Sequence, residues 1–253
     1  MRQFANGVVN GLLKRFGYRL SRLPASRFQA MGETLEWLQS SGYAPRVVID
    51  AGANVGDWTR LASAIFPHAV YHLVEPQPEC HPHLEALAGR MQDGRLHAVA
   101  VSEPGVRSVH MVGANGSSGA WVSPGPAVDS VELPAAILDD IISISPEDRA
   151  LLKLDLENHE LAALRGAAKL LRDVEVVITE VSFYRPSGAA GAAAGSSSWD
   201  EPVFADLVAF LRAQNMELYD FAALSSPLGN RRLRMGDAVF IHRDSPLRAV
   251  HAW

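Results

Sequence analysis

The sequence predicts an α/β fold, in which helices cover both faces of a mainly parallel sheet that ends in an antiparallel last strand. Short apolar runs alternate with amphipathic helices from residue 46 onward, several runs end in an acid, and no helix separates the last two runs. The chain has 253 residues, of which 48% are hydrophobic. This size and composition suit one α/β domain with additions.

Residues 1–42 predict a helical extension ahead of a sheet domain at residues 43–245. Within residues 1–23, apolar side chains recur at helical spacing beside Lys and Arg residues and no acid. Such a segment packs on its own domain or on a second subunit of a homo-oligomer, or it binds an anionic membrane surface or an acidic partner. We favour packing, because periodicity over so short a segment is weak evidence. A second helix is expected near 26–40.

The first half of the sheet domain alternates strands and helices. The run at 46–50 is apolar and ends in an acid, which predicts a buried strand. The helix expected at 55–66 has apolar residues on one face, and a second strand follows at 70–74. A helix at 78–91 and a third strand at 95–101 complete this half.

Two segments depart from this alternation. Residues 102–134 form a glycine-rich insertion, in which short extra strands are expected at 106–112 and 130–133, before a short helix at 134–144. Residues 187–198 consist of Ser, Gly and Ala, which predicts a flexible loop. That loop is interpreted either as a lid over the site or as a tolerated insertion.

The second half resumes the alternation of strands and helices, at 151–155, 159–171, 174–179 and 202–214. Two final strands are expected at 217–221 and 238–242. Because no helix connects these two, the last one is expected to be antiparallel.

The turn after the first strand is the strongest local signal for a cofactor. Asp50 ends the strand, and Gly52, Asn54 and Gly56 follow in a turn that opens a helix. The dinucleotide fingerprint G-x-G-x-x-G is not matched, because Asn54 stands at its second glycine and Asp57 at its third. An acid before such a turn suits a cofactor with a charged amino-acid end and no phosphate, and S-adenosylmethionine has that character.

Two more residues extend this cofactor site. Glu75 ends the second strand, where an acid accepts hydrogen bonds from ribose hydroxyls. Ser102 follows the third strand and is a candidate contact of the adenine, although a solvated turn explains it equally well. We therefore predict an S-adenosylmethionine site at Asp50, Gly52, Asn54, Gly56, Glu75 and Ser102.

These motifs resemble those of the FkbM-type methyltransferases, a family with the class I (Rossmann-like) methyltransferase fold. The resemblance rests on Asp50-Ala-Gly-Ala-Asn-Val-Gly56, on Glu75-Pro76 and on residues 152–167, where the family pattern is close to K-I-D-V-E-G-x-E and then L-x-G-A. The sequence Val176-Val-Ile-Thr-Glu180 matches the next strand of the family. The glycine turn is common to most class I methyltransferases, whereas the stretch 155–167 is much more specific.

The similarity runs from about residue 46 to 243 and departs from the family at Asn158, where the family has Gly. Asn tolerates positive φ, so the turn is expected to persist. The resemblance implies S-adenosylmethionine-dependent O-methylation of a sugar or glycan, a polyketide or a related secondary metabolite.

The candidate catalytic residues follow the fourth and fifth strands. Asp155, Glu157 and His159 lie close in sequence, and Glu180 ends the neighbouring strand, so their side chains are expected at one cleft. A hydroxyl acceptor needs a general base or a metal ion that acidifies it. Either a carboxylate or His159 is the base, or Asp155, Glu157 and Glu180 hold Mg²⁺. We favour a metal-independent base, with His159 best suited by its ordinary pKa.

Acceptor contacts are sought near these residues. Trp121 lies on the glycine-rich insertion with Ser117 and Ser118, and Tyr184 and Arg185 follow the fifth strand. Trp121, Tyr184 and Arg185 are our candidates for binding the acceptor.

Bulk properties exclude several classes of protein. The net charge of −5 argues against a nucleic-acid binder. A single cysteine, Cys80, excludes an intrachain disulfide, and no apolar run is long enough to cross a membrane, so a cytoplasmic location is expected. Two alternatives to the methyltransferase are a catalytically idle S-adenosylmethionine-fold scaffold and a nicotinamide-dependent oxidoreductase. The intact Asp50, Gly52 and Glu75 argue against the first, and the unmatched dinucleotide fingerprint argues against the second.

Overall fold

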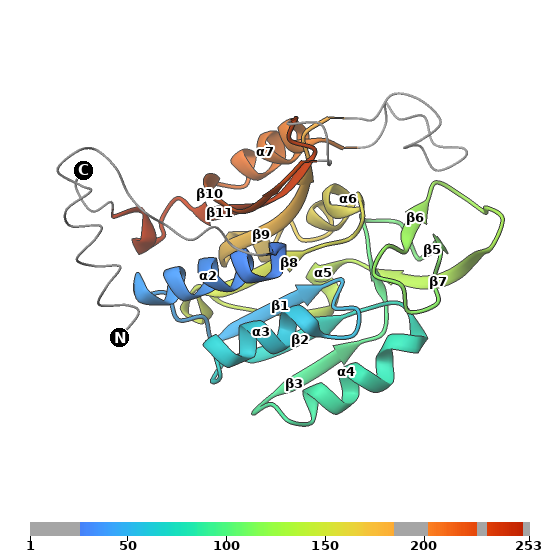
Figure 1. Cartoon of the computed structure of the whole chain (residues 1–253), viewed down its shortest axis with the longest axis horizontal. Helices are drawn as coiled ribbons and strands as arrows, with labels where there is room; N and C mark the ends of the chain where they lie inside the picture. Colours follow the sequence, from blue (N-terminus) through green and yellow to red (C-terminus); the bar gives the residue numbers. More distant parts are fainter. Residues whose placement is uncertain (1–25, 185–201, 227–231, 250–253) are drawn as a thin grey trace.

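The computed structural model describes residues 26–184, 202–226 and 232–249. Its centre is a seven-stranded sheet (Figure 1), with the strand order β10 (Met216–Ser225), β11 (Met235–His242), β9 (Val174–Ser182), β8 (Ala150–Leu154), β1 (Val47–Ala51), β2 (Val70–Val74) and β3 (Gly94–His97). From β3 to β9 all neighbours pair in parallel, whereas β11 is antiparallel to β9 and to β10. The expected antiparallel last strand is confirmed.

The last strand lies inside the sheet rather than at its edge. β11 folds back from β10 and fills the space between β10 and β9. In this register Asp237 of β11 lies directly opposite Glu180 of β9. Two acids from distant parts of the sequence are thereby brought side by side.

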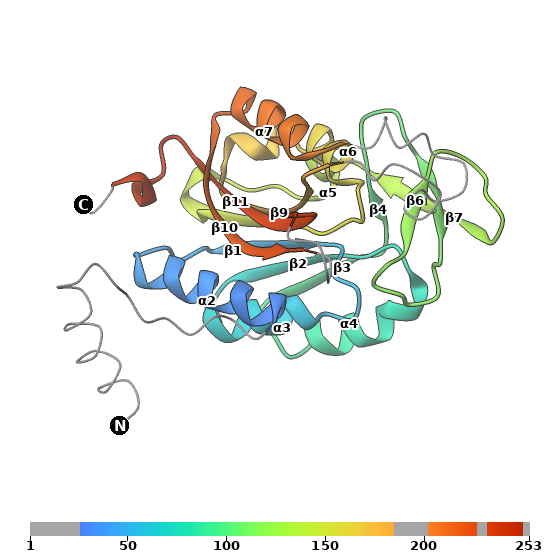
Figure 2. The same cartoon turned by 45° about the horizontal axis from the view of Figure 1, so that its top comes forward.

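Helices cover both faces of the sheet, as predicted (Figure 2). One face carries α2 (Arg27–Ser40), α3 (Asp57–Ile65), the 3₁₀ turn η1 (Pro78–Cys80) and α4 (His81–Ala88). The other face carries α5 (Leu138–Ile141), α6 (Glu160–Arg165) and α7 (Phe204–Ala213). Short 3₁₀ turns also occur at η2 (Pro146–Asp148), η3 (Leu170–Arg172) and η4 (Pro246–Arg248).

Two hydrophobic cores correspond to these two faces. Leu35 and Leu38 of α2 pack with sheet residues such as Ile178 in one core. In the other, Leu164 of α6 and Leu207 of α7 pack on neighbouring sheet residues. Successive strand residues point to opposite faces of the sheet, so a nearly continuous apolar strand contributes side chains to both cores.

Helix α2 belongs to the same hydrophobic core as the sheet. The side chain of Ser26 caps its first turn by accepting a hydrogen bond from the Gln29 amide at 3.1 Å. Leu35 and Leu38 are fully buried. The helix fixes Arg27, its first residue, at the carboxyl ends of the sheet strands. The basic segment at 1–23 and the loop at 187–198 lie outside the described residues.

The glycine-rich insertion contributes to a second, four-stranded sheet with the order β4 (Ala100–Val101), β7 (Ser130–Ala136), β5 (Ser108–Val112) and β6 (Trp121–Ser123). The single third strand predicted at 95–101 is wrong. The chain leaves the main sheet after His97, and β4 pairs in parallel with β7 instead. β7 also extends into the helix predicted at 134–144, which shortens that helix to α5.

The helix predicted at 159–171 is interrupted at Gly166, where α6 ends. A Cβ at Gly166 would lie 2.1 Å from the carbonyl oxygen of Ser102. Only glycine permits this close approach between the end of α6 and the segment after β4. Gly166 therefore fixes the distance between two loops that border the site.

In the part of the chain that the structure describes, every helix is too short or too polar to cross a bilayer.

Candidate functional site

The turn after β1 is held against the turn after β8. Gly52 has a φ of +79°, and a Cβ there would lie 2.1 Å from the carbonyl oxygen of Asp155. The Gly52 and Ala53 amides both donate to the Val74 carbonyl, at 3.0 and 3.1 Å. Three strand ends, those of β1, β2 and β8, therefore meet at one glycine, which lies in the turn that the sequence predicted for the cofactor.

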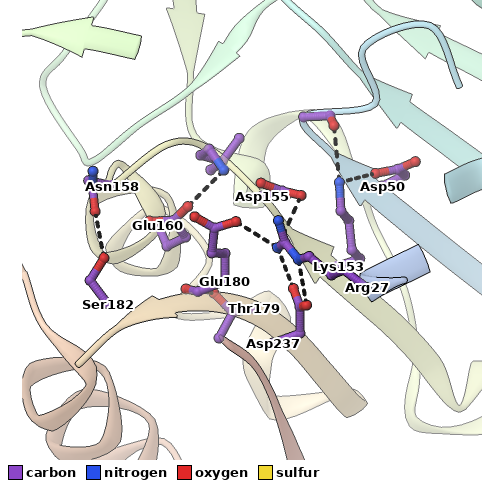
Figure 3. A network of polar contacts seen from close by, with 12 residues as sticks. Arg27, Asp50, Lys153, Asp155, Asn158, Glu160, Thr179, Glu180, Ser182 and Asp237 are labelled. Carbon is purple, nitrogen blue, oxygen red and sulfur yellow. Dashed lines mark hydrogen bonds and ion pairs between the residues drawn. The ribbon is translucent and has the colours of Figure 1, made fainter. Parts of the chain in front are cut away.

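Asp50 lies beneath this turn and is fully buried. Its carboxylate forms an ion pair with Lys153 Nζ at 3.0 Å and accepts a hydrogen bond from Thr59 Oγ1 at 2.6 Å. Lys153 Nζ also donates to the Gly52 carbonyl at 3.0 Å (Figure 3). The carboxylate of Asp50 is therefore used within the protein and is not exposed to a cofactor. Asp50 instead holds Lys153 against the turn.

Lys153 carries its charge inside the protein. Burial alone would lower the pKa of this lysine, but Asp50 and Asp155 together raise it above its ordinary value. The ammonium also lies 5.8 Å from the centre of the Trp58 ring, within range of a cation–π interaction. The cation is therefore stabilised next to the cofactor turn.

Glu75 closes β2 and is almost fully buried. One carboxylate oxygen accepts from the Asn54 amide at 2.8 Å and the other accepts from the Gln77 amide at 3.0 Å. Burial raises the pKa of Glu75 above its ordinary value, while these amides oppose the shift. Each oxygen keeps a second lone pair for a ligand.

The glycine-rich insertion folds over this strand end. Gln77 accepts from the Gly116 amide at 3.0 Å and donates to the Ser117 carbonyl at 3.1 Å. Asn54, at φ +46°, donates its side-chain amide to the Gly116 carbonyl at 3.3 Å. The insertion is therefore tied to both β1 and β2, where it forms one wall of a pocket.

The first pocket lies between these loops and combines a polar floor with apolar walls. Besides Gly52, Asn54 and Glu75, its lining includes Val99, Val101, Met111, Ser117, Ala120, Val122, Asp155, Leu156, Glu157 and His159. Predicted cofactor residues, predicted catalytic residues and the insertion thus meet at one cavity. Concave, mostly apolar cavities with a few convergent polar groups are typical of small-molecule sites.

His159 and Ser102 form a pair at one end of the first pocket. His159 Nε2 lies 3.0 Å from Ser102 Oγ. Burial lowers the pKa of His159, so the ring is neutral near pH 7. Ser102 is buried and does not itself line the cavity, whereas His159 and the two residues of β4, Ala100 and Val101, do.

Beyond Asp155 lies a cluster of charged side chains held by Arg27, which sequence reasoning missed (Figure 3). The guanidinium makes a two-point contact with Asp237, at 2.6 and 2.5 Å. It also forms ion pairs with Glu180 at 2.6 Å and with Asp155 at 3.6 Å. Burial raises the pKa of Glu180, Asp155 adds to this shift, and Arg27 opposes it.

The structure gives no support to the Mg²⁺ set of Asp155, Glu157 and Glu180, which the sequence left open as an alternative to a base. Among the described residues, no group of three or more His, Cys, Asp or Glu side chains is placed to hold a metal ion. Arg27 lies between Asp155 and Glu180 and supplies positive charge there. The Arg27 guanidinium therefore lies where the sequence allowed for a magnesium ion.

The turn after β8 adopts an uncommon backbone conformation. Glu157 and Asn158 have φ values of +51° and +75° in succession. The left-handed conformation expected at Asn158 is confirmed, and Glu157 shares it. Non-glycine residues at positive φ often occur at functional sites. Here the turn directs the backbone from Asp155 along the first pocket to His159.

Other predicted site residues lie elsewhere. A Cβ at Gly56 would lie 2.5 Å from Leu87 of α4, so this glycine serves helix packing, and it is not part of the pocket lining in the described chain. Trp121 lies between Ala120 and Val122, which both line the first pocket, but Trp121 itself does not line it. The guanidinium of Arg232 lies 3.8 Å from the ring centre of Tyr184. Arg185 lies outside the described residues.

A second pocket adjoins the first. The two share Gly52, Asn54, Ser118 and Asp155. The second pocket extends over the first turn of α3 and the start of α2, and its further lining includes Arg27, Phe28, Met31, Trp58, Lys153 and Asp237. Asp155 therefore lies at the junction of the two pockets, with its side chain 32% exposed.

Replacing Gly52 by Ala is expected to lower the free energy of unfolding by at least about 2 kcal/mol, because positive φ alone costs a non-glycine residue roughly 1–2 kcal/mol and the added methyl also meets Asp155. Gly42→Ala is the matched control, since Gly42 has a φ of +88° and open space around its Cβ position. Urea denaturation of both variants measures the difference. Equal losses would contradict the close approach of the two turns.

Sequence reasoning missed Arg27, Lys153 and Asp237 as site residues. Arg27 lies in the helix before the first strand, and Asp237 lies in the last strand, far from every motif. Lys153 lies inside an apolar run, and a charged residue in a buried strand signals a buried partner. That signal was available for Lys153, whereas Arg27 and Asp237 carried none.

Comparison with known families agrees with this geometry. The methyltransferase FkbM domain model matches residues 50–218, which is more than half of the chain. The match includes the first turn, Glu75 and the β8 and β9 strand ends. No curated protein matches the sequence.

Several solved structures resemble the chain at low identity. The methyltransferase FkbM from Methylobacillus flagellatus KT is 15% identical, with a TM-score of 0.48, over 78% of this chain and 44% of that chain. The 1,6-didemethyltoxoflavin-N1-methyltransferase from Burkholderia thailandensis, with bound S-adenosylhomocysteine, is 16% identical, with a TM-score of 0.44, over 85% and 79%. An rRNA methylase from Streptococcus thermophilus is 10% identical, with a TM-score of 0.45, over 88% and 98%. The chain thus spans less than half the length of the Methylobacillus protein.

Proposed function

Because this chain belongs to the FkbM methyltransferase family, we propose that it transfers the methyl group of S-adenosylmethionine to a hydroxyl of a sugar, a glycan or a secondary metabolite such as a polyketide. The observation that carries the proposal is the first pocket, in which the Glu75 carboxylate and the Gly52 turn line one cavity with apolar walls. The metal-free form of the reaction is proposed, since Arg27 occupies the space between the candidate ligands.

The first pocket has the chemistry that an adenosine group requires. Glu75 keeps lone pairs that accept hydrogen bonds from the two ribose hydroxyls. Val99, Val101, Met111 and Val122 provide apolar surface for the faces of a purine. Gly52 packs the turn after β1 against the Asp155 backbone, and its own backbone forms part of the cavity lining.

S-adenosylmethionine supplies an electrophilic methyl group on its sulfonium. The remaining task of the chain is to bring the acceptor oxygen within about 3–3.5 Å of that methyl group and to remove the proton of the hydroxyl. Asp155 is our choice for the base, because it lines both pockets at their junction and its side chain is partly exposed. Arg27 forms an ion pair with Asp155 at 3.6 Å, and Glu180 and Asp237 bind the same guanidinium.

His159, which the sequence favoured as the base, is less well placed. Its Nε2 is engaged by Ser102, and it borders the first pocket but not the second. We propose that the His159–Ser102 pair closes the adenine end of the first pocket.

The charges beyond Asp155 favour an uncharged acceptor. Four carboxylates, those of Asp155, Glu157, Glu180 and Asp237, lie around the single guanidinium of Arg27. A phosphate-bearing acceptor, including a nucleic acid, would be repelled there. This supports a polyhydroxyl compound such as a sugar.

Calorimetry with S-adenosylhomocysteine tests the proposal. We expect the wild-type protein to bind it and NAD to give no heat. Glu75→Gln should weaken S-adenosylhomocysteine binding at least about 10-fold, because hydrogen bonds to a charged group contribute roughly 1.5–3 kcal/mol. Glu79→Gln, an exposed neighbour, is the control. Absence of heat with the wild-type protein would refute the cofactor assignment.

A further inference from the structure

The first turn of α2 forms one wall of the second pocket. Arg27, Phe28 and Met31 line the pocket, and so does Asp237 of β11, which Arg27 binds at two points. Neither α2 nor β11 falls within residues 50–218, which the FkbM domain model matches. This wall is therefore built by parts of the chain that the family pattern does not define.

Arg27 has hydrogen-bonding capacity left for a ligand. A guanidinium has five N–H donors, and Arg27 uses Nε and Nη2 for its contacts with Asp237, Glu180 and Asp155. Among the residues that the structure describes, Nη1 has no hydrogen-bond partner, and 41% of the side chain is exposed. Two N–H donors therefore remain for an oxygen atom of a molecule in the second pocket.

The charges around Arg27 determine which kind of oxygen suits Nη1. The guanidinium contacts three carboxylates, so its single positive charge is more than balanced. An anionic ligand would also meet Asp155 and Asp237 in the pocket lining and would be repelled. Nη1 is therefore suited to an uncharged oxygen, such as that of a hydroxyl or an ether.

Phe28 adds an aromatic surface beside these polar groups. It is 46% exposed and lines the second pocket next to Arg27. The face of a sugar ring carries C–H groups that pack on an aromatic ring, whereas its hydroxyls require hydrogen-bond donors and acceptors. Phe28 supplies the first kind of contact, and Arg27 and Asp155 supply the second. A linear alcohol would lack the flat face that matches Phe28.

We propose that the first turn of α2 is the acceptor subsite and that it binds the uncharged ring of a sugar, with Phe28 against the ring face and Arg27 Nη1 bonded to a ring substituent or the ring oxygen. The inference rests on the proposed function and narrows its acceptor to a sugar. Asp155 lines the same pocket at the junction with the first, within reach of a hydroxyl of that ring. Trp121 and Tyr184, the acceptor contacts that the sequence suggested within the described chain, line neither pocket.

At this subsite one hydroxyl of the sugar reacts. Its proton passes to Asp155 as its oxygen forms a bond to the methyl carbon, and the electron pair of the broken carbon–sulfur bond stays on sulfur. The products are a methyl ether of the sugar and S-adenosylhomocysteine. Phe28 and Arg27 bind the ring and take no part in the proton transfer.

Transfer of a labelled methyl group to defined glycosides tests the inference. The neutral probes are the methyl glycosides of glucose, galactose, mannose, rhamnose and fucose. The methyl glycoside of glucuronic acid is the anionic counterpart, and hexane-1,2-diol is the alcohol without a ring. At least one neutral glycoside should be methylated, and the glucuronide and the diol should each show a kcat/KM at least about 10-fold lower than that glycoside.

Variants of α2 then locate the subsite with the best neutral glycoside. Phe28→Ala should raise its KM at least about 10-fold, whereas Phe28→Tyr, which keeps the aromatic face, should stay within about threefold. Arg27→Lys keeps the positive charge, removes Nη1 and should raise KM about 3- to 10-fold. Trp37→Ala is the matched control, because Trp37 is 45% exposed on the same helix and lies outside both pockets. Affinity for S-adenosylhomocysteine should change less than about threefold in all four variants.

The outcomes separate this inference from the proposed function. If no neutral glycoside is methylated, if the glucuronide is methylated equally well, or if Phe28→Ala leaves KM unchanged, the sugar subsite is overturned. It is also overturned if Phe28→Tyr raises KM as much as Phe28→Ala, or if Phe28→Ala weakens S-adenosylhomocysteine to the same degree. The proposed function survives each of these results as long as the wild-type protein binds S-adenosylhomocysteine. Absence of that binding overturns both. Melting curves show that each variant is measured as folded protein.

Discussion

Replacing Lys153 by Met is expected to lower the free energy of unfolding by about 3–5 kcal/mol, because it leaves a buried carboxylate without its partner. Asp50 is fully buried, and its contacts in the described chain are Lys153 and Thr59. A hydroxyl donor alone does not replace an ammonium at 3.0 Å. The Gly52 carbonyl loses its donor as well, so the cofactor turn should loosen and binding of S-adenosylhomocysteine should weaken.

The double variant Asp50→Asn with Lys153→Met is the control for this prediction. It removes both charges with little change in volume, and replacing a buried ion pair as a whole costs much less than breaking it. Urea unfolding of the two single variants and the double variant measures the coupling free energy. A loss below about 1 kcal/mol for Lys153→Met alone would show that Asp50 does not depend on this lysine.

Replacing Asp155 by Asn is expected to reduce turnover about 100- to 10,000-fold, which is the usual contribution of a general base. The side chain keeps its shape and its place at the junction of the two pockets, but it no longer accepts the proton of the acceptor hydroxyl. The affinity for S-adenosylhomocysteine should change by less than about threefold, since Asn keeps an acceptor oxygen. The measurement is transfer of a labelled methyl group to whichever sugar or polyketide alcohol gives turnover in a panel of acceptors.

Asp244→Asn serves as the control for Asp155→Asn, because the Asp244 side chain is 92% exposed and lies outside both pockets in the described chain. Turnover of this variant should equal that of the wild-type protein. If Asp155→Asn also retains full turnover, Asp155 is not the base. If it loses turnover and cofactor affinity in equal measure, its role lies in binding and not in proton removal.

The local pattern of the sequence determined most of the sheet. The strand predicted at 70–74 coincides with β2, and the absence of a helix between the last two strands correctly predicted an antiparallel pair. Gly52 and Glu75 were found because a glycine turn and an acid at neighbouring strand ends occupy positions that any parallel sheet brings together. These features depend on residues close in sequence, or on geometry common to all α/β sheets.

The tertiary structure decided which polar groups face the cavity and which are used within the protein. Asp50 and Gly56 belong to the same motif as Gly52. Asp50, however, forms an ion pair with Lys153, and Gly56 packs against α4. The order of strands placed Asp237 beside Glu180, and the packing of α2 placed Arg27 between them. No sequence pattern encodes these contacts, because each joins segments far apart in the chain. A buried charge requires a counter-charge or hydrogen-bond partners, and only the folded chain determines which residues provide them.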